Sequence, residues 1–347
     1  MRPDIARTDR MLLDTSNRPI KDLRISVTDR CNFRCTYCMP FDEYEWIEKK
    51  EILSFEEIER LARLFIPLGV DKIRLTGGEP LLRKDLDKLV ARLTALTGLR
   101  DLCLTTNASH LAEMAAPLKA AGLTRINVSL DTLDAEKFKR MTGRGDLAAV
   151  LEGLSVAQRI GLLPIKINAV IERGVNDNEI LDLVEFSRQN GFAIRFIEYM
   201  DVGNANQWQS SRMVSKKEIL EVIQTRYSLR LTGRDQESAP SVDFELTDGS
   251  GDIGVIASVT EPFCFGCTRA RLTADGKLVT CLFSNDGHDL KTLMRSAATD
   301  EDLLEVILAV WTRRADRYSE ERLEAMHSRK GYEPRAHKKI EMIRLGG

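Results

Sequence analysis

The sequence has no stretch of about 18 uncharged apolar residues, the length that a membrane-spanning helix needs. Its first residues, MRPDIARTDRMLL, also lack the apolar run of a signal peptide. Net charge is nearly absent, because 51 Lys and Arg residues balance 53 Asp and Glu residues to give −2. This balance gives no support for a nucleic-acid partner, and nothing predicts a membrane partner. We therefore expect a cytoplasmic protein whose thiols stay reduced.

The sequence has seven cysteines, and six of them form two triplets that each lack a fourth member. These triplets are Cys31-x3-Cys35-x2-Cys38 and Cys264-x2-Cys267-x13-Cys281. In a reducing compartment, such short spacings favour metal binding over disulfides. A closed structural site normally takes four protein ligands, so a triplet leaves one coordination position open for a small molecule.

Zinc is the alternative occupant of both triplets, but neither has an evident fourth ligand. His288 could be proposed for the second triplet, although its place after a Gly-containing turn predicts that it faces solvent. The odd cysteine, Cys103, falls within a predicted strand. Free cysteine usually behaves as a small buried apolar residue, so we expect no ligand role for it.

Apolar–polar alternation predicts six strands in the first two-thirds of the chain, and amphipathic stretches predict helices between them. The strands are expected at 23–29, 72–78, 101–107, 125–131, 164–172 and 193–200. The helices are expected at 54–66, 85–97, 111–121, 134–160 (in two pieces) and 178–190. This alternation is typical of parallel βα units. Because six strands fall short of the eight in a closed barrel, we predict an α/β fold with a partly open (β/α)6 barrel.

The two faces of these strands differ in character. One face is apolar throughout and fits beneath a layer of helices. The other face carries one acid, Asp131, before the sixth strand, together with four basic residues: Arg24, Arg74, Lys166 and Arg195. Buried charges without partners are disfavoured, and a phosphate-bearing ligand would supply the missing negative charge. The alternative is a sheet with one solvated face, although such faces usually mix Glu with Lys.

The last third of the chain departs from this pattern. Polar, turn-rich segments surround a predicted helix at 215–226. A strand is expected at 253–259 and a hairpin at 270–283, followed by mostly helical sequence. We expect residues 1–212 to form the barrel with the first triplet. Residues 213–347 would form an extension that caps the open end of the barrel and carries the second triplet.

The first triplet resembles the signature of the radical S-adenosylmethionine (SAM) superfamily. CNFRCTYC follows the first predicted strand, and TGGEP (76–80) follows the second. The resemblance implies a [4Fe–4S] cluster on Cys31, Cys35 and Cys38, whose fourth iron chelates SAM. Reduction of this cluster would cleave SAM to a 5′-deoxyadenosyl radical. The glycine-rich stretch would meet the methionine moiety, since glycine permits close backbone approach.

The whole chain resembles the GTP 3′,8-cyclase family of molybdenum cofactor biosynthesis. The resemblance rests on seven segments and on the terminal Gly346-Gly347. The segments are RISVTDRCNFRCTYCMP (24–40), IRLTGGEPLLR (73–83), TTN (105–107), NVSLDTL (127–133), KINAVI (166–171), RFIEYMDVG (195–203) and CTRARLTADGKLVTCLF (267–283). It implies a second [4Fe–4S] cluster on Cys264, Cys267 and Cys281, whose open iron binds guanine. The implied reaction removes the 3′ hydrogen of GTP, joins C3′ to C8, and ends as 3′,8-cyclo-7,8-dihydro-GTP. This is the first step of molybdopterin formation.

The resemblance also implies roles for individual residues. Those expected to bind the nucleotide are Arg24, Arg74, Thr105, Lys166, Arg195, Arg269 and Arg271. Those expected to bind SAM are Tyr37, Gly78, Glu79, Ser129 and Met200, with Glu79 orienting the amino group. Those expected to act in catalysis are Arg269, Arg271, Gly346 and Gly347. Taken alone, Arg269-x-Arg271 fits a solvated pair, Met200 fits a core position, and the two glycines fit a frayed terminus.

Partners also follow from the resemblance. They are an electron donor such as flavodoxin or ferredoxin and, downstream, cyclic pyranopterin monophosphate synthase; a homodimer is left open.

Two other functions are also considered. One is another radical enzyme with an auxiliary cluster, such as a peptide-modifying maturase, which predicts more cysteines near the C-terminus. The other is an electron carrier or structural metal protein, which would usually bind its clusters with four cysteines.

Overall fold

The structure is a computed structural model that describes residues 11–234, 238–328, 332–333 and 338–346. The six predicted strands are all present, as β1 (Asp22–Ser26), β2 (Lys72–Thr76), β3 (Asp101–Thr106), β4 (Arg125–Ser129), β5 (Ile165–Ile171) and β6 (Ala193–Glu198). Each pairs in parallel with the next along the chain. The prediction of parallel βα units is therefore confirmed.

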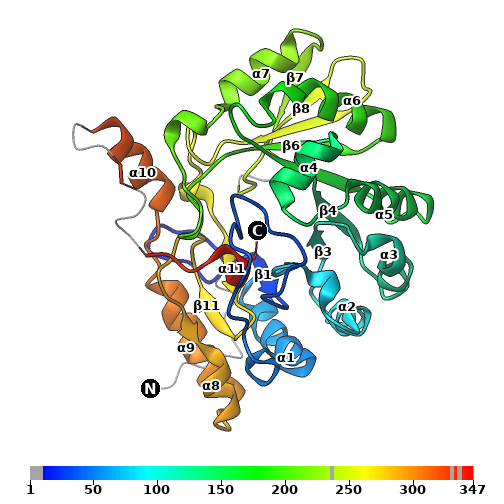
Figure 1. Ribbon diagram of the computed structural model, residues 1–347. Helices are drawn as coiled ribbons and strands as arrows, with labels where there is room; N and C mark the ends of the chain where they lie inside the picture. Colours follow the sequence, from blue (N-terminus) through cyan, green and yellow to red (C-terminus); the bar gives the residue numbers. More distant parts are fainter. Residues whose placement is uncertain (1–10, 235–237, 329–331, 334–337, 347) are drawn as a thin grey trace.

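Helices connect these strands and cover one face of the sheet, as Figure 1 shows. They are α1 (Phe55–Phe65), α2 (Leu86–Thr94), α3 (Leu111–Ala120), α4 (Ala135–Thr142), α5 (Leu147–Arg159) and α6 (Ile180–Asn190). Ser54 and Glu57 form a reciprocal capping box at the start of α1, so the helix begins where its first free N–H groups find side-chain acceptors. The apolar strand face packs beneath these helices; Ile25, Leu75 and Leu104 are fully buried there.

The sheet is larger than predicted, because strands from the last third of the chain extend both of its edges. Beyond β6 lie β9 (Asp252–Ile256), β8 (Val242–Leu246) and β7 (Leu229–Gly233). Beyond β1 lie β10 (Arg269–Leu272), β11 (Lys277–Val279) and β12 (His288–Asp289). Both β9 and β10 run parallel to the strand they join. The extension is thus part of a mixed twelve-stranded sheet rather than only a cap.

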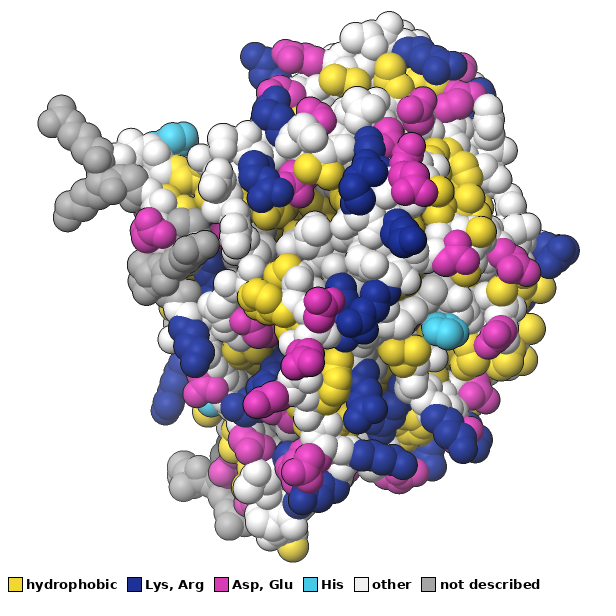
Figure 2. All heavy atoms as spheres, viewed as in Figure 1, with side chains coloured by type: hydrophobic (Ala, Val, Ile, Leu, Met, Phe, Trp, Pro, Cys, Tyr) yellow, Lys and Arg dark blue, Asp and Glu magenta, His cyan; other side chains and the backbone are white. Residues whose placement is uncertain are grey.

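The remaining helices are α7 (Lys216–Gln224), α8 (Leu290–Arg295), α9 (Asp300–Thr312), α10 (Tyr318–His327) and α11 (Met342–Leu345). Short 3-10 turns lie at Lys49–Glu51, Ile66–Leu68, Pro80–Leu82, Asp177–Glu179, Ser210–Arg212 and Cys264–Gly266. Within the described residues, no helix is both long and apolar enough to span a bilayer. Basic and acidic side chains are interspersed over the face drawn in Figure 2, in keeping with the small net charge.

Candidate active site

The polar faces of β1 to β6 curve around one cavity of about 550 Å³, a size typical of small-molecule sites. All seven residues predicted to bind the nucleotide line it: Arg24, Arg74, Thr105, Lys166, Arg195, Arg269 and Arg271. Three predicted SAM-binding residues, Tyr37, Ser129 and Met200, line the same cavity. The second cysteine triplet lines it as well. The alternative of an ordinary solvated sheet face is therefore wrong.

Three arginines in this cavity have unsatisfied hydrogen-bonding groups. Arg24, Arg74 and Arg271 are between 2% and 9% exposed, and the Nε atom of each is buried without a partner. Burial first, and then the guanidinium groups of Arg74 and Arg271, lowers the pKa of Arg24 well below its ordinary value. Burial likewise lowers the pKa of Arg271 to about 10, with Arg269 contributing. An anionic ligand with several acceptor oxygens would relieve both the repulsion and the missing hydrogen bonds.

The cavity is less uniformly basic than the sequence predicts, because acids lie near the amino-terminal ends of the strands. Lys72 Nζ lies 3.8 Å from Asp22 Oδ2 and 3.9 Å from Asp101 Oδ2. Arg125 Nη2 lies 2.6 Å from Asp101 Oδ2. Asp22 stands one residue before the predicted first strand and was missed for that reason. Because Lys72 and Arg125 have acidic partners, the uncompensated positive charge of the cavity lies around Arg24, Arg74 and Arg271.

The first cysteine triplet occupies the loop that follows β1. This loop is fixed to the end of α4, since Arg34 N donates to Thr142 O at 2.7 Å and Thr36 N donates to Met141 O at 3.0 Å. Burial raises the pKa of the Cys31 thiol to about 11. Burial, and then the nearby Cys38 and Cys31 thiolates, raises the pKa of Cys35 well above its ordinary value. The loop therefore gathers three partly buried cysteines.

Gly78 holds this loop in place through a close backbone contact. Its N–H donates to Thr28 O at 2.8 Å, and the N–H of Glu79 donates to Arg30 O at 2.8 Å. A Cβ atom on residue 78 would lie 2.3 Å from the Arg30 carbonyl oxygen, so only glycine fits. The glycine-rich stretch thus packs directly against the residues that lead into Cys31.

Replacing Gly78 with alanine should displace the segment leading into Cys31. We expect the free energy of unfolding to fall by about 1–3 kcal/mol, as for an overpacked site, and the iron content of the reconstituted protein to fall with it. Gly251→Ala is the matched control, because a Cβ there would meet its nearest neighbour at 3.5 Å, an ordinary contact. Denaturant unfolding and iron analysis of both variants make the test; equal behaviour would contradict it.

Tyr37 and Asp131 join the first triplet to the cavity. The Tyr37 hydroxyl donates to Asp131 Oδ2 at 2.8 Å, and Val170 N donates to Asp131 Oδ1 at 2.8 Å. Burial raises the pKa of Asp131 to about 6. In the sequence, Asp131 stands out only as an exception to the basic strand face. The hydrogen bond shows that it positions a tyrosine lying between two cysteines of the triplet.

Glu79 is 1% exposed, and its carboxylate accepts three hydrogen bonds. The donors are Thr106 Oγ1 at 2.6 Å, Asn107 N at 2.7 Å and Leu81 N at 3.0 Å. Burial nevertheless raises the pKa of Glu79 to about 7. The carboxylate therefore ties the end of β3 to the turn at Pro80–Leu82. Its expected role toward the SAM amino group stays a prediction.

The raised pKa of Glu79 predicts a pH dependence of stability. Because the folded pKa of about 7 exceeds the ordinary 4.5, the folded state binds more protons in this window. The contribution of Glu79 to the free energy of unfolding should therefore decrease as pH rises from about 4.5 to 7, by at most about 1.4 kcal/mol per pH unit. Urea unfolding of Glu79→Gln, which cannot titrate, should lack this slope. Parallel pH profiles for the two proteins would contradict the prediction.

The second triplet lies at the start of β10 and just after β11. Arg269 donates from Nε and Nη2 to Cys267 Sγ, at 3.2 Å each. Burial alone would raise the pKa of Cys267, but Arg269 and Arg314 lower it to about 6. Burial raises the pKa of Cys281 to about 11. His288 is exposed on β12 and does not line the cavity, so the structure does not place it as a fourth ligand.

The C-terminal segment enters the centre of the molecule, where α11 lies beside β1 in Figure 1. Met342 lines the cavity, and Leu345 is fully buried. Gly346 has φ +69°, and a Cβ there would lie 2.2 Å from Thr76 Cγ2 at the end of β2. The alternative of a frayed terminus is therefore wrong for Gly346. Gly347 lies outside the described residues.

The donor set of each triplet fits an iron–sulfur cluster. Among the described residues, no three Cys, His, Asp or Glu side chains converge on a single metal ion. The cysteines that ligate a [4Fe–4S] cluster bind separate irons, so they need not converge on one point. Cys103, by contrast, is fully buried in β3 and does not line the cavity, as expected for a small apolar residue.

Comparisons with known proteins agree with this arrangement. Residues 25–187 match the radical SAM superfamily, and residues 192–320 match Molybdenum Cofactor Synthesis C. The chain is 48% identical to a GTP 3′,8-cyclase from Acidothermus cellulolyticus, over 96% of this chain and 98% of that protein. The chain belongs to the GTP 3′,8-cyclase family. A second GTP 3′,8-cyclase, from Aquifex aeolicus, is 46% identical over 97% of this chain and all of that protein.

A solved structure supports the fold of this family member. Streptococcus suis SuiB bound to precursor peptide SuiA matches with a TM-score of 0.61 at 17% identity, over 85% of this chain and 66% of that chain. At that identity the likeness concerns the fold alone. Both cysteine triplets lie within the matched families, the first in the radical SAM region and the second in the cofactor-synthesis region.

Proposed function

We propose that this protein is a GTP 3′,8-cyclase that converts GTP to 3′,8-cyclo-7,8-dihydro-GTP, the first step of molybdenum cofactor biosynthesis. One observation carries the proposal beyond family membership. The cavity joins three buried arginines with unsatisfied Nε atoms to the second cysteine triplet, and Tyr37, between two cysteines of the first triplet, also lines it. A nucleoside triphosphate fits this arrangement, because its phosphates need the arginines while its base and sugar lie between the two metal sites.

We assign the first [4Fe–4S] cluster and SAM to Cys31, Cys35 and Cys38, and a second [4Fe–4S] cluster to Cys264, Cys267 and Cys281. When bound and reduced, the first cluster supplies a 5′-deoxyadenosyl radical from SAM that removes the 3′ hydrogen of GTP. These assignments follow the division into a partly open βα barrel at 1–212 and an extension at 213–347. The zinc alternative is not favoured, because neither triplet gains a fourth ligand among the residues that the structure describes.

The residues of this chain act mainly by placement and by excluding water. Arg24, Arg74 and Arg271 would bind the triphosphate, with Lys166 and Arg195 beside them, and would thereby fix the ribose relative to SAM. Thr105 accepts a weak hydrogen bond from Arg74 Nη1 at 3.4 Å and would contact the same nucleotide. The expected SAM contacts are Tyr37, Gly78, Glu79, Ser129 and Met200. After C3′ joins C8, one electron and one proton complete the dihydro product.

The decisive experiment mixes anaerobically reconstituted, reduced protein with SAM and GTP. We expect 5′-deoxyadenosine and a cyclised nucleotide in equal amounts, and about eight irons per chain. Failure to form both products would overturn the cyclase assignment. About four irons, or tightly bound zinc, would overturn the two-cluster assignment. A peptide-modifying maturase is not favoured, because the likeness to SuiB is limited to the fold.

The proposed phosphate site predicts a loss of affinity on removing one arginine. Arg271→Met should weaken GTP binding about tenfold to a hundredfold, the cost of one hydrogen-bonded charge contact. Folding should be preserved, because the change removes repulsion with its buried neighbours. Arg100→Met is the control; Arg100 lies at the rim of the cavity and is mostly exposed, so affinity should change less than about twofold. Equilibrium titration with GTP measures both, and an unchanged affinity in Arg271→Met would contradict the site.

The remaining partners are proposals from the same family resemblance. An electron donor such as flavodoxin or ferredoxin would reduce the clusters. Cyclic pyranopterin monophosphate synthase would consume the product. A homodimer is also left as a proposal.

A further inference from the structure

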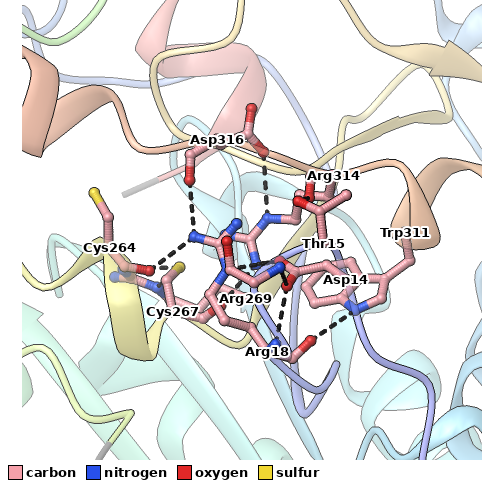
Figure 3. Close-up of polar contacts among 10 residues, drawn as sticks. Asp14, Thr15, Arg18, Cys264, Cys267, Arg269, Trp311, Arg314 and Asp316 are labelled. Atoms are coloured by element: carbon pink, nitrogen blue, oxygen red, sulfur yellow. Dashed lines mark hydrogen bonds and ion pairs between the residues drawn. The ribbon is translucent and has the colours of Figure 1, made fainter.

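A buried ion network connects the two ends of the chain behind the second cysteine triplet. Asp14 Oδ2 lies 2.6 Å from Arg18 Nε and 3.2 Å from Arg314 Nη1. The side chains of these three residues are at most 3% exposed. Figure 3 shows the network directly beside Cys264 and Cys267. None of the three residues belongs to the signatures that the sequence analysis identified.

Both arginines reach past Asp14 to the backbone of the triplet. Arg18 Nη1 donates to Cys264 O at 2.8 Å, and Arg314 Nη1 donates to Cys267 O at 2.7 Å. The intervening turn is closed by Cys267 N, which donates to Cys264 O at 3.1 Å. The two guanidinium groups therefore hold both ends of the Cys264–Cys267 turn, and one carboxylate sets the distance between them.

The network is itself anchored to rigid structure. Trp311, in α9, donates from Nε1 to Arg18 O at 3.1 Å, and the Arg314 guanidinium stacks over the Trp311 ring at 4.6 Å. Thr15 Oγ1 donates to Arg314 O at 2.6 Å, which joins the N-terminal segment to the end of α9. Arg18 and Arg314 also bind Asp316, through its carbonyl oxygen at 2.8 Å and its Oδ2 at 3.2 Å. The contacts extend from α9 through the arginines to the cysteines.

Stability of the fold alone does not account for this network. Buried ion pairs pay a large desolvation cost, and well-packed apolar residues of similar volume often stabilise a fold as well or better. What apolar residues cannot do is donate directed hydrogen bonds to two chosen carbonyl oxygens. Arg18 Nη2 is also buried without a hydrogen-bond partner, which is a further cost to the stability of the fold. The contacts therefore point to a function at the cysteine turn.

We propose that Asp14, Arg18 and Arg314 are positioning residues that hold Cys264 and Cys267 in the arrangement that the second cluster requires. The segment Asp14–Arg18, which precedes the barrel in sequence, thereby belongs to a site whose ligands lie about 250 residues later. The proposal rests on the two-cluster form of the proposed function and adds to it the residues that shape the site. It makes assembly of the second cluster depend on both ends of the chain.

The test is Asp14→Asn in the full-length protein. The asparagine Oδ1 can still accept from Ser16 N and Arg18 N, both at 2.9 Å, so the local turn is kept. Its amide would face the two guanidinium groups, which then lose their counter-charge. We expect iron to fall from about eight to about four per chain. The spectrum of the reduced first cluster and the formation of 5′-deoxyadenosine should be retained. If GTP binds the second cluster as proposed, its addition should change the EPR spectrum of the unsubstituted protein, and this change should be lost in Asp14→Asn.

Two further variants separate positioning from folding. Glu172→Gln removes the charge of another buried acid, which pairs with Arg212. It should keep about eight irons. Arg18→Lys keeps a cation for Asp14 but has one ammonium group in place of the guanidinium that reaches Cys264 O. It should also lose the second cluster, and it replaces Asp14→Asn if that variant does not fold.

The outcomes are distinguishable. Variants that lose thermal stability but keep both clusters would overturn the positioning role and leave the cyclase proposal standing. About four irons in the unsubstituted protein would instead overturn the two-cluster assignment on which the inference rests.

Discussion

Gly346→Ala is expected to abolish most turnover while leaving both clusters loaded. An added Cβ would lie 2.2 Å from Thr76 Cγ2 and 2.6 Å from Thr76 Oγ1, so the end of the C-terminal segment must move out of the site. A displacement of about 1 Å near reacting groups can cost about 10²-fold in rate. The measurement is the rate of cyclised nucleotide formation under saturating SAM and GTP. A rate within about twofold of the unsubstituted protein would contradict the proposed role of this segment.

The control separates steric displacement from backbone strain. Gly249 has φ +72°, almost the same as the +69° of Gly346, but a Cβ there would meet nothing within 4 Å. Gly249→Ala therefore also places an alanine at positive φ, at a cost of about 1–2 kcal/mol, without the clash. We expect Gly249→Ala to lower the free energy of unfolding slightly and to keep its turnover. Equal losses of turnover in both variants would mean that strain, not the contact with Thr76, is responsible.

The C-terminal segment reaches Thr76 because it is anchored upstream by Asp201. Lys339 Nζ donates to Asp201 O at 2.7 Å and to its carboxylate at 2.5 Å. The carboxylate also accepts from Tyr318 and Arg322 in α10. Asn204, three residues further along, exchanges hydrogen bonds with the backbone of Lys339, at 2.5 and 2.8 Å. These contacts fix the direction of the segment before it turns into the cavity.

The sequence predicted the βα region well because its signals are local. Alternation along β5 placed Ile165 and Ile167 in the core, and the polar residue between them, Lys166, in the cavity. The same reasoning placed Arg24 and Arg74 on one face, and the register pairs them directly across β1 and β2. Side-chain direction in a strand depends only on position along that strand, so it could be predicted.

Long-range pairing could not be predicted in this way. Nothing in Arg269–Leu272 indicates that it lies parallel to β1, with Arg24 opposite Arg271. That register brings two arginines from distant parts of the chain together. The sequence predicts only a polar segment where β7 and β8 lie, because the residues of these strands are mostly half-buried or exposed and alternate weakly. The positioning role of Asp14 was equally hidden, since its partners come from the far end of the chain.

Cys264→Ala is expected to separate the two parts of the proposed chemistry, which are the formation of 5′-deoxyadenosine and the cyclisation of GTP. The substitution removes one sulfur ligand of the second cluster and leaves the first triplet unchanged. It also keeps the Cys264 carbonyl, so the hydrogen bond from Arg18 Nη1 at 2.8 Å persists and the turn keeps its backbone support. With the proposed guanine-binding iron lost or displaced, GTP should no longer be held with C8 close to C3′. We therefore expect some 5′-deoxyadenosine formation but little or no cyclised nucleotide.

The matched control is Cys103→Ala, which removes a buried thiol that does not line the cavity. That variant should lose some stability because of the small void it creates, yet keep about eight irons and full product formation.

The amount of cyclised nucleotide divided by the amount of 5′-deoxyadenosine gives the coupling ratio for each protein. If Cys264→Ala kept the ratio of the unsubstituted protein, the second triplet would not bind the base. The arginines alone would then have to orient GTP. Because we propose that those arginines contact the phosphate groups, a loss confined to product formation would instead place base recognition at the second triplet.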